Sequence, residues 1–172
     1  MSPAVVVDTN VPVVTNGGAK QASPECITAC MRRLRQLTDS ESERLVLDDH
    51  WLIIREYQRN LRSEGQPGFG DAFLKWVLTN RTNSARCEFV SITPTDNYET
   101  DFVEFPRDPD LMRFDPSDRK FVAVALTHSQ RPTILQAVDA KWWQAKEPLC
   151  RNGISVEFLC EDDVLRLLRE PE

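Results

Sequence analysis

The strongest constraint on the fold is a regular alternation of short apolar runs with stretches of helical periodicity. Five runs rich in Val, Ile and Leu predict strands, at residues 4–7, 45–47, 87–92, 133–138 and 155–159. Between them, apolar residues recur at helical spacing and predict helices, at residues 24–37, 50–62, 71–79, 115–126, 140–151 and 162–169. Strands that alternate with helices predict an α/β fold: a three-layer α/β/α sandwich with a central, mostly parallel sheet.

The length of 172 residues suits one domain with a sizeable core, so we expect residues 1–172 to form a single domain. Residues 12–23 contain a Gly-Gly pair and predict a loop, and residues 65–68 (Gly-Gln-Pro-Gly) should end a helix. Residues 94–116 hold four prolines and predict a long acidic loop or flap.

Composition excludes several classes of protein. No apolar run approaches the roughly 18 residues needed to span a bilayer, and the N-terminus lacks the pattern of a secretory signal. The five cysteines show no recognisable metal-binding spacing; Cys26 and Cys30 should share one helix face as buried free thiols. We therefore expect a protein of the reducing cytoplasm, without a membrane partner.

The charge distribution bears on nucleic-acid binding. A net charge of −6 argues against a general electrostatic attraction to nucleic acid. However, residues 96–115 carry seven acidic residues against two arginines, so the rest of the chain is close to neutral. A local basic groove is therefore compatible with the composition.

Four acidic residues stand where a parallel sheet would bring them together. Asp8 and Asp139 follow apolar strands, which places both at the carboxyl edge of the sheet. Asp118 begins a helix whose N-terminus lies at that edge, and Glu56 stands beside the apolar face of its helix. Such carboxylates repel one another unless a cation neutralises them, and oxygen ligands suit Mg²⁺ or Mn²⁺. The simpler alternatives are helix caps for Asp8 and Asp139, a first-turn aspartate favoured by the helix dipole for Asp118, and an exposed helical acid for Glu56.

Four segments carry a resemblance to a known family. They read V-V-V-D-T-N-V at residues 5–11, R-E-Y at 55–57, D-R-K-F-V-A-V-A at 118–125 and I-L-Q-A-V-D-A at 134–140. In these segments the chain resembles the PIN-domain nucleases. The resemblance implies a parallel sheet between helices and a ribonuclease site dependent on Mg²⁺ or Mn²⁺. By position, it implies an acidic cluster with two supporting side chains: Asp8, Glu56, Asp118 and Asp139, with Thr9 and Asn10 beside the first acid.

The mechanism that follows is metal-assisted hydrolysis of an RNA phosphodiester. A cation held by Asp8, Asp118 and Asp139 would activate a water, and Glu56 would complete the cluster through the metal or a bound water. In-line attack would leave a 5′-phosphate and a 3′-hydroxyl, as the resemblance implies. His50 and His128 are the two histidines, and neither lies in a recognisable acid–base motif.

Two features depart from the family pattern. Many relatives carry another acid two residues after the last one, where this chain has Lys141, and the acidic segment at residues 96–115 is longer than a compact member requires. They keep open the alternative of a catalytically weak or inactive PIN-like binding module. A third alternative is the toxin of a toxin–antitoxin pair, in which an antitoxin occupies the groove.

Substrate contacts are the least determined part of the hypothesis. Basic side chains that could hold RNA phosphates are Arg59, Arg62, Arg119, Lys120 and Lys141. Their alternative is a solvated helix surface. Trp142 and Trp143 could stack on a base, although we expect one in the core and the other as a partly buried support. Whether the RNA is single-stranded or structured stays open, and so does the binding of a second copy of the chain or of another protein.

Overall fold

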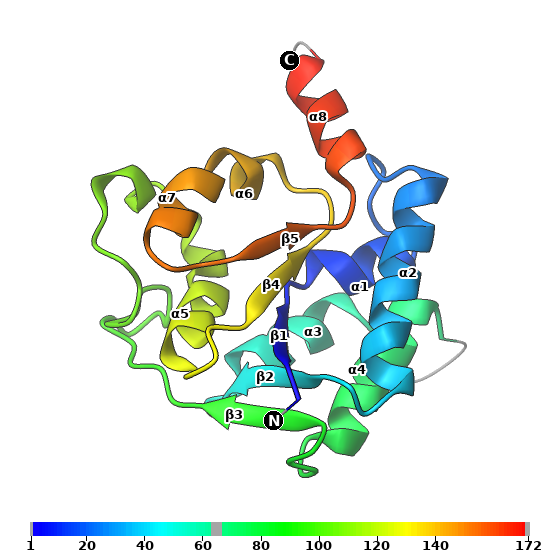
Figure 1. Ribbon diagram of the computed structural model, residues 1–172, viewed down its shortest axis with the longest axis horizontal. Coiled ribbons are helices and arrows are strands. Elements are labelled where there is room, and N and C mark those ends of the chain that lie inside the picture. Colours follow the sequence, from blue (N-terminus) through cyan, green and yellow to red (C-terminus); the bar gives the residue numbers. More distant parts are fainter. Residues whose placement is uncertain (1, 63–66, 171–172) are drawn as a thin grey trace.

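Five strands form one sheet in the order β3-β2-β1-β4-β5, seen near the centre of Figure 1. The computed structural model describes residues 2–62 and 67–170. The strands are β1 (Ala4–Val7), β2 (Arg44–Asp48), β3 (Cys87–Val90), β4 (Thr133–Gln136) and β5 (Val156–Phe158). All the pairings between them are parallel. The predicted α/β fold is confirmed, and the sheet is parallel throughout rather than mostly so.

Helices flank the sheet in two groups. Figure 1 shows α2 and α4 on one side of the strands (right) and α5, α6 and α7 on the other (left). The helices are α1 (Asn10–Thr15), α2 (Pro24–Asp39), α3 (Leu52–Asn60), α4 (Phe69–Asn80), α5 (Arg119–Thr127), α6 (Ala140–Gln144), α7 (Lys146–Arg151) and α8 (Glu161–Arg169), with 3₁₀ turns η1 (Pro109–Leu111) and η2 (Pro116–Asp118). Helix α5 packs on β1, β2 and β4, and α1 packs on α2 and α4.

The apolar runs form strands because the fold buries their side chains. Every residue of β1 and β2 is buried, which explains why β1 and the centre of β2 (Leu45 to Leu47) are continuously apolar rather than alternating. Local signals set the helix starts. The Ser23 side chain caps α2 by accepting from the N–H of Cys26, and the buried carboxylate of Asp48 accepts from the N–H groups of Leu52 and Ile53 at the start of α3.

The predicted loop at residues 12–23 is wrong in its first part, because helix α1 runs to Thr15. Pro12 lies in the first turn of α1, where a missing N–H costs no helical hydrogen bond. Close packing on α4 holds this short helix. A Cβ on Gly70 would come within 2.0 Å of the Pro12 carbonyl oxygen, so only glycine permits this approach. The Asn16 side chain adds hydrogen bonds to Asp71 and to the N–H of Gly70.

Other predicted boundaries shift by a few residues. The single helix expected at residues 140–151 is two helices, α6 and α7, that meet at Ala145. The acidic loop at 94–116 contains η1 and an isolated antiparallel bridge between Pro94 and Phe102. The break expected at residues 65–68 falls partly outside the described residues, since only Pro67 and Gly68 are described. Within the described ranges, every helix is too short or too polar to cross a membrane.

The cysteine prediction requires a correction. Cys26 is not a free thiol, because it forms a disulfide with Cys160, which lies 134 residues away in the sequence. The fold brings the start of α2 beside the residue that precedes α8, an approach that sequence spacing does not reveal. Cys30 is free and buried, as expected. The disulfide also removes the support that cysteine usage gave to a reducing compartment.

Candidate active site

The topology explains why Asp8 and Asp139 come together. From β1 the chain adds β2 and β3 on one side of the sheet, then returns to add β4 and β5 on the other. Where adjacent parallel strands have crossovers that run in opposite directions, a crevice opens at their carboxyl ends, and ligands bind there in open α/β sheets. Asp8 directly follows β1, and Asp139 lies three residues after β4. Both therefore lie at the reversal point of the sheet.

Asn10 fixes the two strand ends relative to each other. Its side-chain oxygen accepts from the N–H of Val138 at 2.8 Å, across the crevice. Its backbone N–H donates to Oδ1 of Asp8 at 2.9 Å. One residue therefore orients the first carboxylate and ties down the segment that carries Asp139, which gives Asn10 a supporting role in the geometry.

Asp8 is the most enclosed of the four acids, with 5% of its surface exposed. Burial holds the pKa of its carboxyl well above the usual value, and the negative charges of Asp118, Glu56 and Asp139 raise it further. The hydrogen bond from Asn10 opposes this shift only in part. An excess of negative charge is thus concentrated around Asp8.

Glu56 joins this group from α3 and is held by two neighbours. The hydroxyl of Thr9 donates to one of its carboxylate oxygens, and the ammonium of Lys120 donates to the other at 3.0 Å. Lys120 also bonds to the carbonyl of Ser117. Both partners of the Lys120–Glu56 ion pair are largely buried, so neither side chain turns freely. Thr9 therefore supports Glu56 rather than capping α1.

Asp118 ends η2 and makes no side-chain cap to α5. Its carboxylate instead accepts from the indole N–H of Trp142 at 3.2 Å. Burial and the charges of Asp115, Asp139 and Glu56 raise the pKa of Asp118 to about 7, against the opposing effect of Lys120. Its position at the N-terminus of α5 agrees with the helix-dipole alternative, while its side chain bonds to Trp142.

Asp139 combines two roles. Its carboxylate caps α6, accepting from the N–H groups of Lys141 and Trp142 at 2.9 and 3.4 Å. Burial raises its pKa, although these two hydrogen bonds partly counteract the shift. The cap alternative is therefore correct for Asp139. Both cap hydrogen bonds use Oδ1 of Asp139, so its Oδ2 remains available to other partners.

Asp115 is a fifth carboxylate of this cluster, which sequence reasoning placed in the acidic loop and at the start of a helix but not among the site residues. It caps η2 through the N–H of Ser117, and its charge raises the pKa of both Asp118 and Asp139. Lys141 lies 3.7 Å from its carboxylate. The sequence signal for Asp115 was its position three residues before Asp118, because residues at that spacing lie on one turn.

The carboxylates lie around one region of the sheet edge, and their oxygens do not converge on a single point. Among the described residues, the one group whose metal-binding atoms all lie within 4.8 Å of one another consists of cysteines, not of these acids. Mg²⁺ usually keeps several waters and binds directly to only one or two carboxylates. The residues therefore fit a hydrated divalent cation, because the donor atoms are oxygens and neighbouring carboxylates add to the effect of burial in raising the pKa of Asp8 and of Asp118.

The predicted phosphate-binding residues separate into two groups. Arg119 is buried, and its guanidinium donates to Asp101 and to backbone carbonyls of the acidic loop, so we exclude it from the substrate contacts. Lys120 forms its ion pair with Glu56. The remaining residues are exposed or largely exposed: Arg59, Arg62 and Lys141. Trp142 is fully buried and Trp143 is half-buried against Phe158, as the sequence predicts.

Two clefts flank the acidic cluster. One, of about 360 Å³, is lined by Asp115, Asp118, Trp142 and two cationic side chains, Arg113 and Lys141. The other, of about 210 Å³, is lined by several residues that include Glu56, Arg59, Tyr98, Ser117 and Lys120. Each cleft combines a carboxylate of the cluster with cationic groups and an aromatic ring. An extended anionic ligand could therefore pass from one cleft to the other across the carboxylates.

Comparison with known proteins gives no further assignment. No family model matches the chain, and no match is found among curated proteins or solved structures. Functional inference therefore rests on the residues and geometry described above.

Proposed function

We propose that this chain is a PIN-like nuclease that hydrolyses RNA phosphodiesters with Mg²⁺ or Mn²⁺. The observation that carries the proposal is the position of Asp8. It is buried at the reversal point of a parallel sheet, where the charges of three further carboxylates raise its pKa. A fold that retains mutually repelling acids in a crevice is best explained by a cation that binds there. The resemblance of the four segments to PIN-domain nucleases supports the same reaction and substrate class.

The residues have distinct roles in this proposal. Asp8, Asp118 and Asp139 would hold the cation, and Trp142 and Asn10 would keep two of these carboxylates in place. A bound Mg²⁺ or Mn²⁺ would supply a coordinated water of lowered pKa and would neutralise charge on the phosphate. Glu56, fixed by Thr9 and Lys120, would orient a water at the edge of the cluster.

The two clefts define a path for the RNA strand. Arg59 lines one cleft and Lys141 the other, so phosphates bound in each cleft would meet a cationic group. Tyr98, which is 84% exposed beside Arg59, offers a ring on which a base could stack. The path therefore suits a single strand with accessible bases.

An Asp8→Asn variant tests the catalytic assignment. We expect cleavage of end-labelled single-stranded RNA in Mn²⁺ to fall by about a hundredfold or more. Asp39→Asn, which changes an exposed acid at the end of α2, is the matched control and should cleave at the wild-type rate. The Asn side chain relieves charge repulsion, so Asp8→Asn should be as stable as the wild type in urea. Full activity in Asp8→Asn would overturn the assignment.

The binding-module alternative has one specific observation in its favour. The Lys120–Glu56 ion pair already neutralises one carboxylate of the cluster. A module of this kind would bind RNA equally well in Mn²⁺ and in EDTA, and the wild type would leave the RNA intact. If the wild type cleaves RNA only with metal and Asp8→Asn does not cleave it, the binding-module alternative is excluded.

A further inference from the structure

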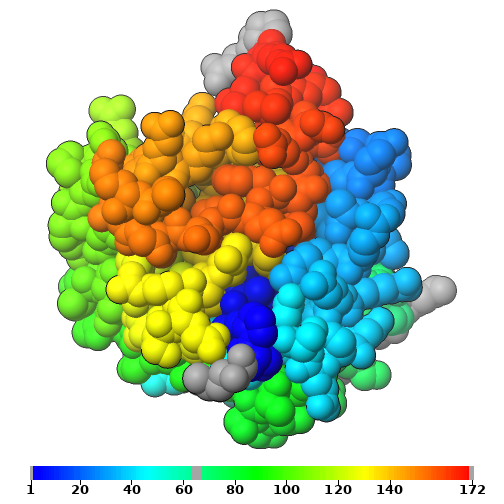
Figure 2. Space-filling view, in the orientation of Figure 1, coloured from blue at the N-terminus to red at the C-terminus, as the bar shows by residue number. Residues whose placement is uncertain are grey.

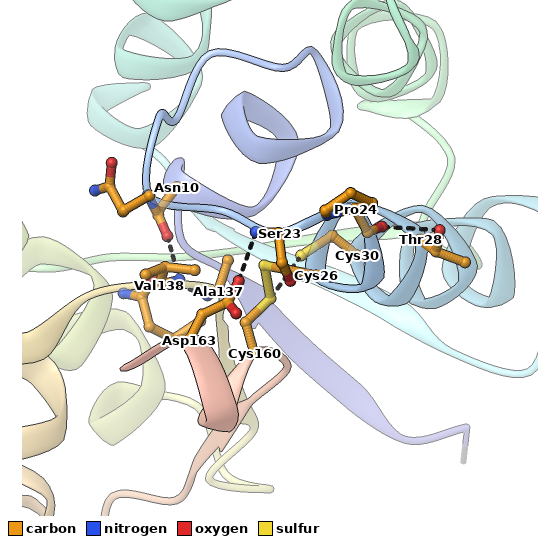
Figure 3. Close-up of a disulfide and its surroundings, with 12 residues drawn as sticks. Asn10, Ser23, Pro24, Cys26, Thr28, Cys30, Ala137, Val138, Cys160 and Asp163 are labelled. Atoms are coloured by element: carbon orange, nitrogen blue, oxygen red, sulfur yellow. Dashed lines mark hydrogen bonds between the residues drawn. A yellow bond between two sulfur atoms is a disulfide. The ribbon is translucent and has the colours of Figure 1, made fainter. Parts of the chain in front are cut away.

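A second cluster of ligand-type side chains lies away from the carboxylates, where α2 and α8 begin. Cys26 and Cys30 are one turn apart on α2, and Cys160 immediately precedes α8. Cys26 and Cys160 form the disulfide, and the sulfur of Cys30 lies 3.7 Å from that of Cys160 (Figure 3). Within the described ranges, this is the one group of three potential metal ligands whose atoms all lie within 4.8 Å of one another.

The cluster has a route to solvent. Cys26 and Cys160 line a cavity of about 350 Å³, although little of either residue is exposed. The cavity is acidic, since the ionisable side chains that line it apart from the two cysteines are Glu25, Glu161, Asp162 and Asp163. Figure 2 shows the beginning of α2 (blue) beside the base of α8 (red) at the surface. An acidic entrance attracts cations and gives a metal ion a path to the sulfurs.

We propose that, when the Cys26–Cys160 disulfide is reduced, Cys26, Cys30 and Cys160 bind a thiophilic divalent cation of the Zn²⁺ type. Tetrahedral zinc with sulfur ligands at about 2.3 Å places neighbouring sulfurs roughly 3.8 Å apart. The Cys30 and Cys160 sulfurs already have this spacing. Reduction frees Cys26 to take the same position relative to the other two, and the fourth ligand is a water from the cavity.

A thiol reductant supplies the two electrons that break the Cys26–Cys160 disulfide. Two reductant thiols become a disulfide as the Cys26–Cys160 bond is converted into two thiols. Binding then forms three metal–sulfur bonds, and the three cysteine thiols release three protons to solvent. A small-molecule disulfide would oxidise Cys26 and Cys160 back to their disulfide and be reduced to two thiols, while Cys30 takes up a proton and the metal is released.

The surroundings are arranged to hold the cluster in place. Asp163 accepts from the N–H of Ser23 at 2.7 Å and lies 3.3 Å from Arg166, so it links the two helix starts (Figure 3). Two of the three sulfurs lie at the N-terminal ends of α2 and α8, whose partial positive charge favours thiolates. This site does not depend on the proposed nuclease activity, because none of its ligands belongs to the carboxylate cluster.

Co²⁺ titration of the reduced full-length protein tests the proposal. Co²⁺ replaces Zn²⁺ in thiolate sites and produces charge-transfer absorption that carboxylate sites lack. We expect one Co²⁺ per chain in reducing buffer, displaced by Zn²⁺, and no such absorption in the protein with its disulfide intact. Cys30→Ser keeps both disulfide partners and should lose more than about tenfold in affinity. Cys150→Ser, which alters an exposed thiol, and Asp8→Asn should bind like the wild type.

The proposal is overturned if reduced wild type shows no thiolate absorption with Co²⁺, or if Cys30→Ser binds as tightly as wild type. Should the reduced protein unfold without metal, circular dichroism provides the readout. Recovery of the helical signal on adding Zn²⁺ to wild type but not to Cys30→Ser supports the site, and equal behaviour of the two proteins contradicts it.

Discussion

The indole N–H of Trp142 donates to the carboxylate of Asp118 at 3.2 Å, which joins the first turn of α6 to the start of α5. Trp142 is fully buried, and its ring packs edge-on against Phe114 of the acidic loop. One side chain therefore connects the core, the acidic loop and a carboxylate of the candidate active site. Replacing it tests whether the core positions Asp118.

The Trp142→Phe variant retains an aromatic ring but removes the hydrogen-bond donor. We expect a loss of about 2 kcal/mol in the free energy of unfolding, since the bond goes to a charged group and the smaller ring leaves space. The pKa of Asp118 should rise further, so metal-dependent activity should need a higher pH. Trp143→Phe is the control, because that ring packs on Phe158 away from Asp118. Identical pH profiles for wild type and Trp142→Phe would exclude a positioning role.

The raised pKa of Asp118 predicts a pH dependence of stability in the absence of metal. The folded protein holds this proton up to about pH 7, whereas the unfolded chain releases it near 3.8. The folded state therefore binds more protons across that window, and the free energy of unfolding should fall as the pH rises from about 4 to 7. We expect Asp118→Asn to reduce this fall by about 2 kcal/mol. Urea unfolding in EDTA at a series of pH values provides the measurement, and parallel curves for the two proteins would contradict the prediction.

Metal binding should show the opposite dependence on pH. Carboxylates bind a cation in their deprotonated form, so Mn²⁺ affinity should increase as the pH passes through about 7. Isothermal titration at pH 6 and pH 8 would measure it. Equal affinity at both values would place the cation away from Asp118.

Arg119 and Arg107 form a matched pair for testing what holds the acidic loop. Both guanidinium groups bond to Asp101, but Arg119 is buried and stacks over Phe105, whereas Arg107 is half-exposed. Arg119→Ala should cost about 3 kcal/mol of stability, because it removes the donor to one oxygen of the partly buried Asp101 carboxylate and to two backbone carbonyls. Arg107→Ala should cost less than about 1 kcal/mol. Urea unfolding measures both, and limited proteolysis at residues 94–116 shows whether the loop has loosened. Equal losses would contradict this account.

Tyr98 should contribute to RNA affinity and not to folding. If a base stacks on its exposed ring, Tyr98→Ala should weaken binding of single-stranded RNA by about tenfold, whereas Tyr98→Phe should bind normally. Met112→Ala alters another exposed apolar side chain of the same loop outside the cleft, and is expected to bind like the wild type. Fluorescence anisotropy with Asp8→Asn as the background avoids cleavage. Unchanged affinity in Tyr98→Ala would place the RNA elsewhere.

The sequence predicted the centre of the sheet well because β1 and β2 are buried on both faces. A continuous apolar run such as β1 has few other stable environments, and the acid that follows it must then lie at the sheet edge. Helix α1 was missed because six residues cannot form a stable helix alone, and its stability comes from packing on α2 and α4. The split between α6 and α7 at Ala145 has a local cause, because Pro148 has no N–H to donate to Gln144 and is tolerated only in the first turn of a new helix.

Contacts between distant segments were beyond sequence reasoning. The Lys120–Glu56 ion pair joins residues from α5 and α3, and the same lysine was predicted to contact phosphate. Arg119, one position earlier, points into the loop instead of towards the carboxylates. Adjacent basic residues thus have different partners because successive positions on a helix face different directions. Spacing can place a residue on an element, but its partner depends on which elements pack together.

The Cys26–Cys160 disulfide has a consequence for the chain after proteolytic cleavage. The bond closes a loop that contains four of the five strands, β2 to β5, together with Asp139, whereas β1 and Asp8 precede the loop. A single cut anywhere between the two cysteines, for example in the acidic loop, would leave two polypeptides that remain covalently joined. Such a nicked molecule would migrate as one species until it is reduced, so a single band on a non-reducing gel does not demonstrate an uncut backbone.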